Sequence, residues 1–257
     1  MRWCKMKHIL LLIVTWLHLI SDTNSKCSGD KKTDKSSKKD IKISRGNFEA
    51  NLIFLNRTGL LTKDRNILEI GSGKGALVSY LSKKGYRITG TDISLLALRV
   101  AVKNDPQNQY LGADGFDLPF KNNTFDLVLS FDVFEHIPDT DKHLEEVKRV
   151  LKPNGYYLLQ TPNKWTNAPF EIIKEKSLSR YKEYHSSLHN YWQLKRRFEK
   201  NGFNVRFYDI PVVNDFFRAK IKRQFGKFSL KLLSIFNPDR FPYFLKTNFY
   251  MEGKLER

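Results

Sequence analysis

Short apolar runs and longer amphipathic stretches alternate along residues 46–165 of the chain. The apolar runs, bounded by turn-forming residues, predict strands over 66–70, 86–93, 109–114, 125–132 and 156–162. The amphipathic stretches predict helices over 47–61, 76–85, 94–104 and 141–151, and "KPNG" at 152–155 predicts a turn. Strands that alternate with helices in this way are typical of βαβ units, so we expect an α/β fold with a mostly parallel sheet and helices on both faces.

The pattern of the last third of the chain is less regular. It predicts a helix over 190–203 that ends at a glycine, and strands over 204–210 and 247–255. Between these two strands, residues 216–236 place aromatic and aliphatic side chains at helical spacing, with Lys and Arg interleaved. We therefore expect a basic amphipathic segment there, interrupted by Gly226, that serves as a lid or lies on a membrane surface.

The charge of the chain is large and unevenly distributed. The 257 residues have a hydrophobic content of 40%, enough for a packed core, and a formal net charge of +18. Residues 46–165 carry 15 Lys+Arg and 14 Asp+Glu, whereas residues 166–257 carry 19 and 9. The C-terminal third therefore suits an anionic partner, or reflects a general bias toward lysine. Cys4 and Cys27 precede the expected core, which excludes a disulfide framework, a zinc cluster or a cysteine nucleophile within it.

Residues 1–25 have the pattern of a targeting segment, because basic residues precede an apolar run over 9–20. Twelve residues span about 18 Å as a helix, less than the ~30 Å hydrocarbon core of a membrane. We expect a cleaved signal peptide that leads to the secretory pathway, a membrane anchor with the folded domain held on the cytoplasmic side, or a wrongly assigned start. Residues 26–45 are rich in lysine and nearly free of apolar residues, so they predict a disordered linker.

The stretch "ILEIGSGKGALVSYL" at 67–81 joins a strand to a helix through a glycine-rich turn. A nucleotide-binding P-loop is excluded, because the lysine of this turn is followed by Gly75 rather than by Ser or Thr. A dinucleotide-binding fingerprint is formally satisfied by the spacing from Gly71 to Ala76, with Asp92 where a ribose-binding acid is expected. The turn alone therefore leaves the dinucleotide and S-adenosylmethionine interpretations open.

Two acidic residues favour S-adenosylmethionine over a dinucleotide. Glu69 places a carboxylate on the buried strand before the turn, where a pyrophosphate would be repelled and a cationic ligand tolerated. Asp114 ends the third strand, where a carboxylate can accept a hydrogen bond from an adenine amino group. A ligand held by the glycine turn, Asp92 and Asp114 would cross three strand ends, as an adenosine with an amino-acid tail does.

At this point the sequence resembles a known family. The blocks "LEIGSGKG", "GTDIS", "GADGFDLPFKNNTFDLVLSFDVFEHIPD" and "LKPNGYYLLQTPN", which lie within residues 66–164, look like successive signatures of class I S-adenosylmethionine-dependent methyltransferases, in the small-molecule branch called type 11 or type 12. The resemblance implies a Rossmann-like, mostly parallel seven-stranded sheet closed by an antiparallel hairpin. It implies a cofactor-binding core over 46–165 and a C-terminal part over 166–257 that completes the sheet, with a substrate or lid insertion over 211–246.

The resemblance also implies cofactor roles for particular residues. Glu69 and the glycine turn would meet the methionine portion of S-adenosylmethionine, Asp92 the two ribose hydroxyls and Asp114 the adenine. Ser130 would lie beside the transferring methyl group, or it simply ends a strand. The complete implied set is Glu69, Gly71, Ser72, Gly73, Gly75, Asp92, Ile93, Asp114, Gly115, Phe116 and Ser130.

Three histidines are candidates for a catalytic base. The cofactor supplies an activated methyl group, so a base is needed only for an acceptor that is protonated at neutral pH. His136 follows the fourth strand and either removes the acceptor proton or only orients its loop; His185 and His189 lie where related enzymes carry a substrate-binding segment. A divalent ion held by Asp132, Glu135 and His136 is the less favoured interpretation, and we expect no metal.

Three functions fit these observations. We favour methyl transfer to a small-molecule acceptor through a hydroxyl or carbon, such as a sugar, lipid, quinone precursor or secondary metabolite. Where enzymes that methylate flat exocyclic amines carry an Asn-Pro-Pro-Tyr-like block, this chain reads "SFDV". The alternatives are an RNA methyltransferase that uses the basic C-terminal region, which lacks a recognised RNA-binding module, and a cofactor-binding scaffold without catalysis.

Overall fold

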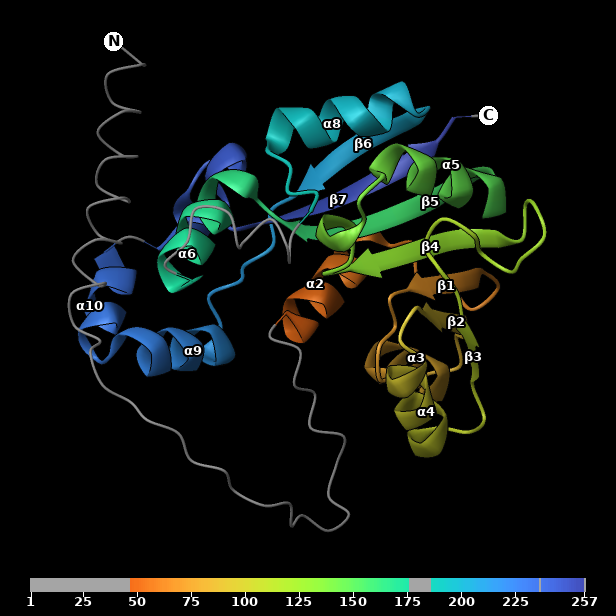
Figure 1. Ribbon diagram of the computed structural model, residues 1–257, viewed down its shortest axis with the longest axis horizontal. Coiled ribbons are helices and arrows are strands. Elements are labelled where there is room, and N and C mark those ends of the chain that lie inside the picture. The colour runs from red at the N-terminus through yellow and green to blue at the C-terminus, as the bar shows by residue number, and fades with distance from the viewer. Residues whose placement is uncertain (1–46, 176–185, 236, 257) are drawn as a thin grey trace.

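The computed structural model describes residues 47–175, 186–235 and 237–256, and all structural statements concern these residues (Figure 1). The predicted targeting segment, the predicted lysine-rich linker and His185 lie outside them. Among the described residues, no helix is both long enough and apolar enough to span a membrane. The domain boundaries expected from the sequence stay predictions.

A single seven-stranded sheet forms the centre of the molecule, in the order β3-β2-β1-β4-β5-β7-β6. The strands are β1 (Asn66–Ile70), β2 (Arg87–Asp92), β3 (Gln109–Gly112), β4 (Phe125–Phe131), β5 (Leu151–Pro162), β6 (Phe203–Tyr208) and β7 (Asn248–Leu255). Strands β1 to β5 are parallel, and β7 lies antiparallel between β5 and β6. The mostly parallel sheet with a closing antiparallel pair, expected from the sequence, is confirmed.

Helices cover both faces of this sheet (Figure 1). One apolar core lies under α2 (Phe48–Thr58) and α3 (Ala76–Lys83), and the other under α5 (Thr140–Val150) and α8 (Tyr191–Lys200). Helix α4 (Leu95–Asn104) contacts β2 and β3. Helix η1 (Phe134–His136) follows β4, and α6 (Lys164–Glu175) follows β5. Four short elements lie between β6 and β7: α9 (Asp215–Phe225), α10 (Phe228–Ile235), η2 (Pro238–Arg240) and η3 (Tyr243–Leu245).

Local signals in the sequence set several helix ends. The Ser94 side chain accepts a hydrogen bond from the backbone of Ala97 and caps α4, as the sequence predicts. Gly59 adopts a left-handed backbone (φ 66°) where α2 ends. Asn190 and Gln193 form a reciprocal capping box at the start of α8. These contacts satisfy backbone groups that a helix terminus leaves without an intrahelical partner.

One prediction from the sequence needs correction. Strand β5 begins at Leu151, before the "KPNG" turn, and its pairing with β4 then jumps from Leu151 to Tyr156, so the predicted turn is an irregularity inside the strand. No prediction covered the residues directly after β5, where α6 forms with Pro169 inside it. The run "TPNKWTNAP" has the composition of a loop, and a contact distant in sequence overrides it: Asn163 donates hydrogen bonds to the carbonyls of Phe244 and Lys246.

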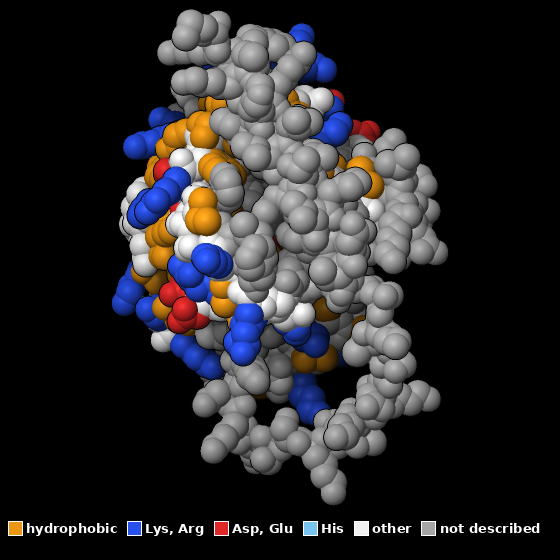
Figure 2. Space-filling view, turned by 90° about the vertical axis from the view of Figure 1, so that its left-hand side faces the viewer, with side chains coloured by type: hydrophobic (Ala, Val, Ile, Leu, Met, Phe, Trp, Pro, Cys, Tyr) orange, Lys and Arg blue, Asp and Glu red, His pale blue; other side chains and the backbone are white. Residues whose placement is uncertain are grey.

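The amphipathic segment between β6 and β7 is confirmed as two helices, α9 and α10, separated by Gly226 with φ 76°. Ile221 and Leu233 are buried, whereas Lys222 and Arg223 are exposed, so part of the apolar face packs inside the protein. Figure 2 shows the side of the molecule on which Figure 1 draws α6, α9 and α10, and hydrophobic and basic side chains alternate over its coloured part.

Candidate cofactor and acceptor site

The glycine turn between β1 and α3 has a backbone that only glycine adopts readily. Gly71, Gly73 and Gly75 all have left-handed φ angles, of 72°, 55° and 75°. A Cβ atom on Gly71 would lie 2.1 Å from Cγ2 of Val133, and one on Gly75 would lie 2.5 Å from the Tyr110 hydroxyl. Glycine at these positions therefore lets Val133 and Tyr110 pack directly against the backbone of the turn at the carboxyl edge of the sheet.

Asp92, the last residue of β2, links this turn to the next helix. One of its carboxylate oxygens accepts a hydrogen bond from the Gly73 amide at 2.7 Å, and the other accepts one from the Ser94 amide at 2.8 Å. Ile93, the next residue, exposes 73% of its surface. The structure thus brings together an oriented carboxylate and an uncovered apolar side chain, which suit a ribose and the flat base attached to it.

Glu69 and Ser72 lie beneath the turn and are 1% exposed each. The Ser72 amide donates to the Thr91 carbonyl at 2.8 Å and so joins the turn to β2. Burial, together with the charges of Asp105 and Glu69, raises the pKa of Tyr110 to about 12. An acidic side chain, Glu69, thus lies under the turn, which suits a cationic methionine tail better than a pyrophosphate.

The loop after β3 is held by a buried histidine that sequence reasoning missed. Asp114 is exposed, and its side chain accepts from the Phe116 amide at 3.2 Å. His143 donates from Nδ1 to the Gly115 carbonyl at 2.8 Å and accepts the Tyr157 hydroxyl at Nε2, 3.0 Å away. Burial lowers the pKa of His143 to about 4, so the ring stays neutral. His143 lies on the apolar face of α5, a place that gives no functional signal in sequence.

The residues that follow β4 pack against the glycine turn, because Val133 lies beside Gly71. Ser130 is completely buried one residue before the strand ends, so its predicted place beside the methyl group stays a prediction. Asp132 has a left-handed backbone (φ 56°), and the Asn47 side chain donates to its two carboxylate oxygens at 3.2 and 3.3 Å. A rare backbone conformation held by a side chain distant in sequence is typical of functional loops.

Glu135 and His136, in η1, form an acidic and basic pair at this edge. Glu135 is 2% exposed and accepts a hydrogen bond from Thr161 at 3.0 Å. Burial, then the charge of Asp132, raises the pKa of Glu135 to about 8. The side chain of His136 is half exposed, with its Nε2 3.9 Å from Glu135 Oε1. The sequence suggested Glu135 only as a metal ligand, since its burial is not visible in the local pattern.

Replacing Glu135 by glutamine is expected to remove a pH dependence of stability. A carboxyl whose pKa rises from 4.5 to about 8 on folding binds its proton more tightly in the folded state. Wild-type stability from this group is therefore present at low pH and is lost as the pH rises toward about 8. At about 1.4 kcal/mol per pKa unit, the variant gains a few kcal/mol on the wild type between about pH 5 and pH 9.

Urea unfolding at these pH values measures the effect. Glu145→Gln, an exposed carboxylate on α5, is the matched control and should shift little at either pH. An equal difference between Glu135→Gln and wild type at both pH values would show that Glu135 is ionised in the folded protein.

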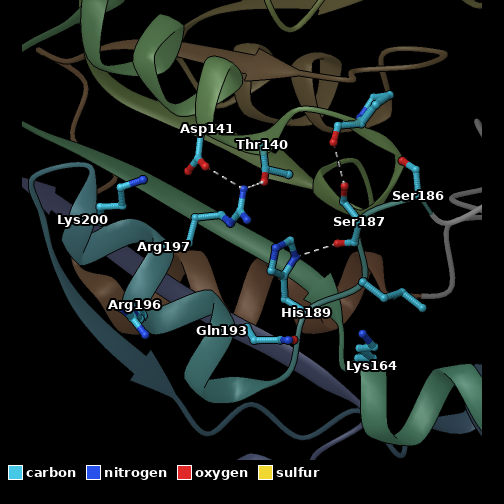
Figure 3. Close-up of a pocket in the computed structure, with 12 residues that line it drawn as sticks. Thr140, Asp141, Lys164, Ser186, Ser187, His189, Gln193, Arg196, Arg197 and Lys200 are labelled. Carbon is cyan, nitrogen blue, oxygen red and sulfur yellow. Dashed lines mark hydrogen bonds and ion pairs between the residues drawn. The ribbon is translucent and has the colours of Figure 1, made fainter.

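His189 lies apart from the glycine turn, in a cleft between α5 and α8 (Figure 3). It is 8% exposed and donates from Nδ1 to the Ser187 carbonyl at 2.7 Å. Burial, then the charge of Arg197, lowers the pKa of His189 to about 4. Its ring packs on Phe134 with the ring centroids 5.6 Å apart. The two described histidine candidates thus lie in different surroundings, with His136 the more accessible.

The described residues hold no group of three or more His, Cys, Asp or Glu side chains placed to bind a metal ion. Glu135 instead bonds Thr161, and Asp132 is bonded by Asn47.

Comparison with known proteins finds similarity to methyltransferases. Residues 68–159 match the sequence family described as a methyltransferase domain. The chain is 32% identical over 123 residues to phosphoethanolamine N-methyltransferase 2 of Caenorhabditis elegans, which covers 46% of this chain and 28% of that protein. It is 34% identical over 164 residues to an uncharacterised protein of Methanocaldococcus jannaschii, which covers 62% of this chain and 66% of the relative.

A solved structure shares the fold. Phosphoethanolamine N-methyltransferase 2 of Haemonchus contortus, in complex with phosphomonomethylethanolamine and S-adenosylhomocysteine, matches with a TM-score of 0.58 and 22% identity over 82% of this chain and 53% of that chain. Residues 68–159 thus form a methyltransferase domain of the class I S-adenosylmethionine-dependent family, and S-adenosylmethionine is the cofactor of that family. The left-handed glycine turn, the oriented Asp92 carboxylate and the buried Glu69 fit this cofactor.

Proposed function

We propose that this protein transfers a methyl group from S-adenosylmethionine to a hydroxyl or carbon of a small-molecule acceptor. The observation that carries the proposal is the glycine turn, whose left-handed backbone is hydrogen-bonded to Asp92 at the carboxyl edge of the sheet. Glu69 and the turn would hold the methionine portion, Asp92 the ribose hydroxyls, and the Asp114–Phe116 loop the adenine. The methylated atom would then lie near the residues that follow β4.

The cofactor supplies a methyl group that is already activated by its sulfonium. The task of the chain is to align the acceptor with that group and to keep water away. For a hydroxyl acceptor, His136 takes the proton at Nε2 while the new carbon–oxygen bond forms and the carbon–sulfur bond breaks. His136 suits this role because its side chain is half exposed at the edge where β4 ends.

A His136→Gln variant is expected to lower kcat for a hydroxyl acceptor by about 100-fold or more, because general-base catalysis contributes that much. Its affinity for S-adenosylhomocysteine should equal that of the wild type. A screen of hydroxyl, carbon and amine acceptors with labelled methyl donor provides the substrate, and the amines are included because two of the relatives are named N-methyltransferases. Unchanged kcat in the variant would show that His136 is not the base and only orients its loop.

The same screen addresses the alternative functions. Cofactor binding without methyl transfer to any acceptor would favour the scaffold hypothesis. RNA affinity that falls steeply with salt would favour the RNA hypothesis.

We further propose that α9 and α10 cover the acceptor side as a lid or rest on a membrane surface. The support is that Lys222 and Arg223 are exposed and that Ile235, at the end of α10, exposes 61% of its surface. Flotation with anionic vesicles tests the membrane role: binding that is lost in a Lys222→Glu, Arg223→Glu variant supports it. Equal flotation of the variant and the wild type would contradict it.

A further inference from the structure

The cleft that contains His189 lies between the start of α5, the start of α6 and one side of α8, and has a volume of about 550 Å³ (Figure 3). This volume is within the range of about 300–1,000 Å³ that is usual for ligand pockets. Its lining residues are Pro138, Thr140, Asp141, Lys164, Ser186, Ser187, Leu188, His189, Gln193, Arg196, Arg197 and Lys200. None of these except His189 was a candidate site residue from the sequence.

The charge of this cleft is strongly positive. Four basic side chains line it, from Lys164 on α6 and Arg196, Arg197 and Lys200 on α8, against one carboxylate, Asp141. The lowered pKa of His189 reports the same field, because after burial the charges of Arg197 and Lys164 both act to lower it. A cleft lined by one sign of charge concentrates ligands of the opposite sign.

One of the four cations is already held in place, and the other three remain available to a ligand. Arg197 donates to the Thr140 hydroxyl and forms an ion pair with Asp141 at 3.2 Å, as Figure 3 shows. Among the described residues, Lys164, Arg196 and Lys200 make no ion pair. With Asp141 balanced by Arg197, the cleft retains a surplus of positive charge that suits a dianion.

Neutral hydrogen-bonding groups complete the lining. Ser186 contributes a hydroxyl and Gln193 an amide group beside the cations, whereas the Ser187 hydroxyl already donates to the Pro138 carbonyl. Helix α5 begins at Thr140, which lines the cleft, so the positive end of its dipole lies beside the cleft, where the Asp139 side chain caps it. A group with several acceptor oxygens and two negative charges, such as a phosphate monoester, matches this set of donors.

The cleft is joined directly to the loop that follows β4. The Ser187 amide donates to the Glu135 carbonyl at 2.9 Å, and the Ser187 hydroxyl donates to the Pro138 carbonyl at 3.3 Å. On its other side this loop reaches the glycine turn, because Val133 lies where a Cβ of Gly71 would be. The cleft and the expected cofactor site therefore adjoin the same loop.

We infer that this cleft binds the phosphate of a phosphorylated acceptor and so selects the substrate. The inference rests on the proposed methyltransferase function, and it assigns the substrate class. Lys164, Arg196 and Lys200 contact the phosphate oxygens, and Arg197 is a positioning residue that Asp141 orients. The remainder of the cleft, which is larger than one phosphate, takes the adjoining part of the acceptor.

Calorimetric titration of the full chain with inorganic phosphate tests the cleft directly. A Lys164→Gln, Arg196→Gln variant should bind phosphate at least about tenfold more weakly than the wild type, since each removed charge deletes a charge-assisted hydrogen bond. Lys195→Gln is the matched control: it removes a positive charge from α8 outside the cleft, where Lys195 pairs with Glu199. Equal phosphate affinity in the double variant, the control and the wild type would overturn the inference.

A second titration, with S-adenosylhomocysteine, separates this inference from the proposed function. The double variant should bind it as the wild type does, which also shows that the variant is folded. If the wild type fails to bind S-adenosylhomocysteine, the proposed function fails while the phosphate result still reports on the cleft. If, in that case, phosphate still binds the double variant more weakly than the wild type, the cleft is an anion-binding site even though the proposed function fails.

The source of the phosphate is resolved by two further arms. Labelled methyl transfer is compared between phosphorylated acceptors and their dephosphorylated forms, and KM for the former should rise about tenfold in the double variant at unchanged kcat. Vesicles of phosphatidic acid and of phosphatidylcholine test whether the phosphate belongs to a lipid headgroup. In that case the wild type binds the phosphatidic acid vesicles but not the phosphatidylcholine vesicles, and the double variant binds neither. Binding to single-stranded RNA but not to inorganic phosphate would overturn the inference.

Discussion

A Gly71→Ala variant is expected to lose about 2–4 kcal/mol of stability and most of its affinity for S-adenosylhomocysteine. Two costs combine at this position. The left-handed backbone (φ 72°) is unfavourable for any residue with a Cβ, and the added Cβ would lie 2.1 Å from Cγ2 of Val133. Relief of this contact requires the turn and the loop after β4 to separate, and both border the expected cofactor. Urea unfolding and calorimetric titration measure the two effects.

The chain offers a control that separates the two costs. Gly59 has nearly the same backbone (φ 66°), with no heavy atom within 4 Å of an added Cβ. A Gly59→Ala variant should therefore lose only the backbone contribution, about 1–2 kcal/mol, and bind the cofactor normally. A Gly71→Ala, Val133→Ala variant should recover part of the difference. If Gly71→Ala were no more costly than Gly59→Ala, the contact with Val133 would not constrain the turn.

An Asp92→Ala variant is expected to bind S-adenosylhomocysteine at least about 100-fold more weakly. The carboxylate is already placed by the amides of Gly73 and Ser94 at 2.7 and 2.8 Å, so it is pre-organised for ribose hydroxyls. Loss of two hydrogen bonds to a charged group costs about 3 kcal/mol or more, and 1.4 kcal/mol corresponds to a factor of ten. The same substitution frees the turn, which adds to the loss.

Isothermal titration measures this affinity. Asp64→Asn, an exposed carboxylate in the turn before β1, is the control and should bind normally. Asp92→Asn keeps one acceptor oxygen and should fall between the alanine variant and the wild type. Wild-type affinity in Asp92→Ala would exclude the ribose role, whatever the acceptor proves to be.

The residues expected near the cofactor could be proposed from the sequence because they lie in one continuous stretch. The glycine turn and Asp92 are 21 residues apart at most, and their spacing encodes both the left-handed turn and the strand end that meets it. The apolar runs likewise predicted the seven strands, and most clearly the central parallel ones, since strands buried on both faces are short, apolar and bounded by turn residues. The helix after β5 was missed because its composition is that of a loop, and Asn163 stabilises its start from a contact with residues 244–246.

Properties that depend on burial could not be read from the local pattern. Glu135 appears in sequence as one more acidic residue, yet removal from water and the nearby Asp132 raise its pKa to about 8. His143 appears in sequence as one position on the apolar face of α5, yet the fold buries it completely and bonds it to Gly115 and Tyr157. In each case the functional property comes from groups that the fold brings close, and the sequence alone does not specify their distance.

By itself, the sequence predicted the strands and the glycine turn and, through its resemblance to a known family, the sheet and the cofactor, because the motifs that carry that resemblance lie along one continuous stretch. The basic cleft was left to the fold. Its lining joins the segment after β4 to residues 164, 186–189 and 193–200, and only the packing of α8 beside α5 brings their charges together. Electrostatic fields add over space rather than along the chain, so the anion site and the substrate class inferred from it emerge only once the chain is folded.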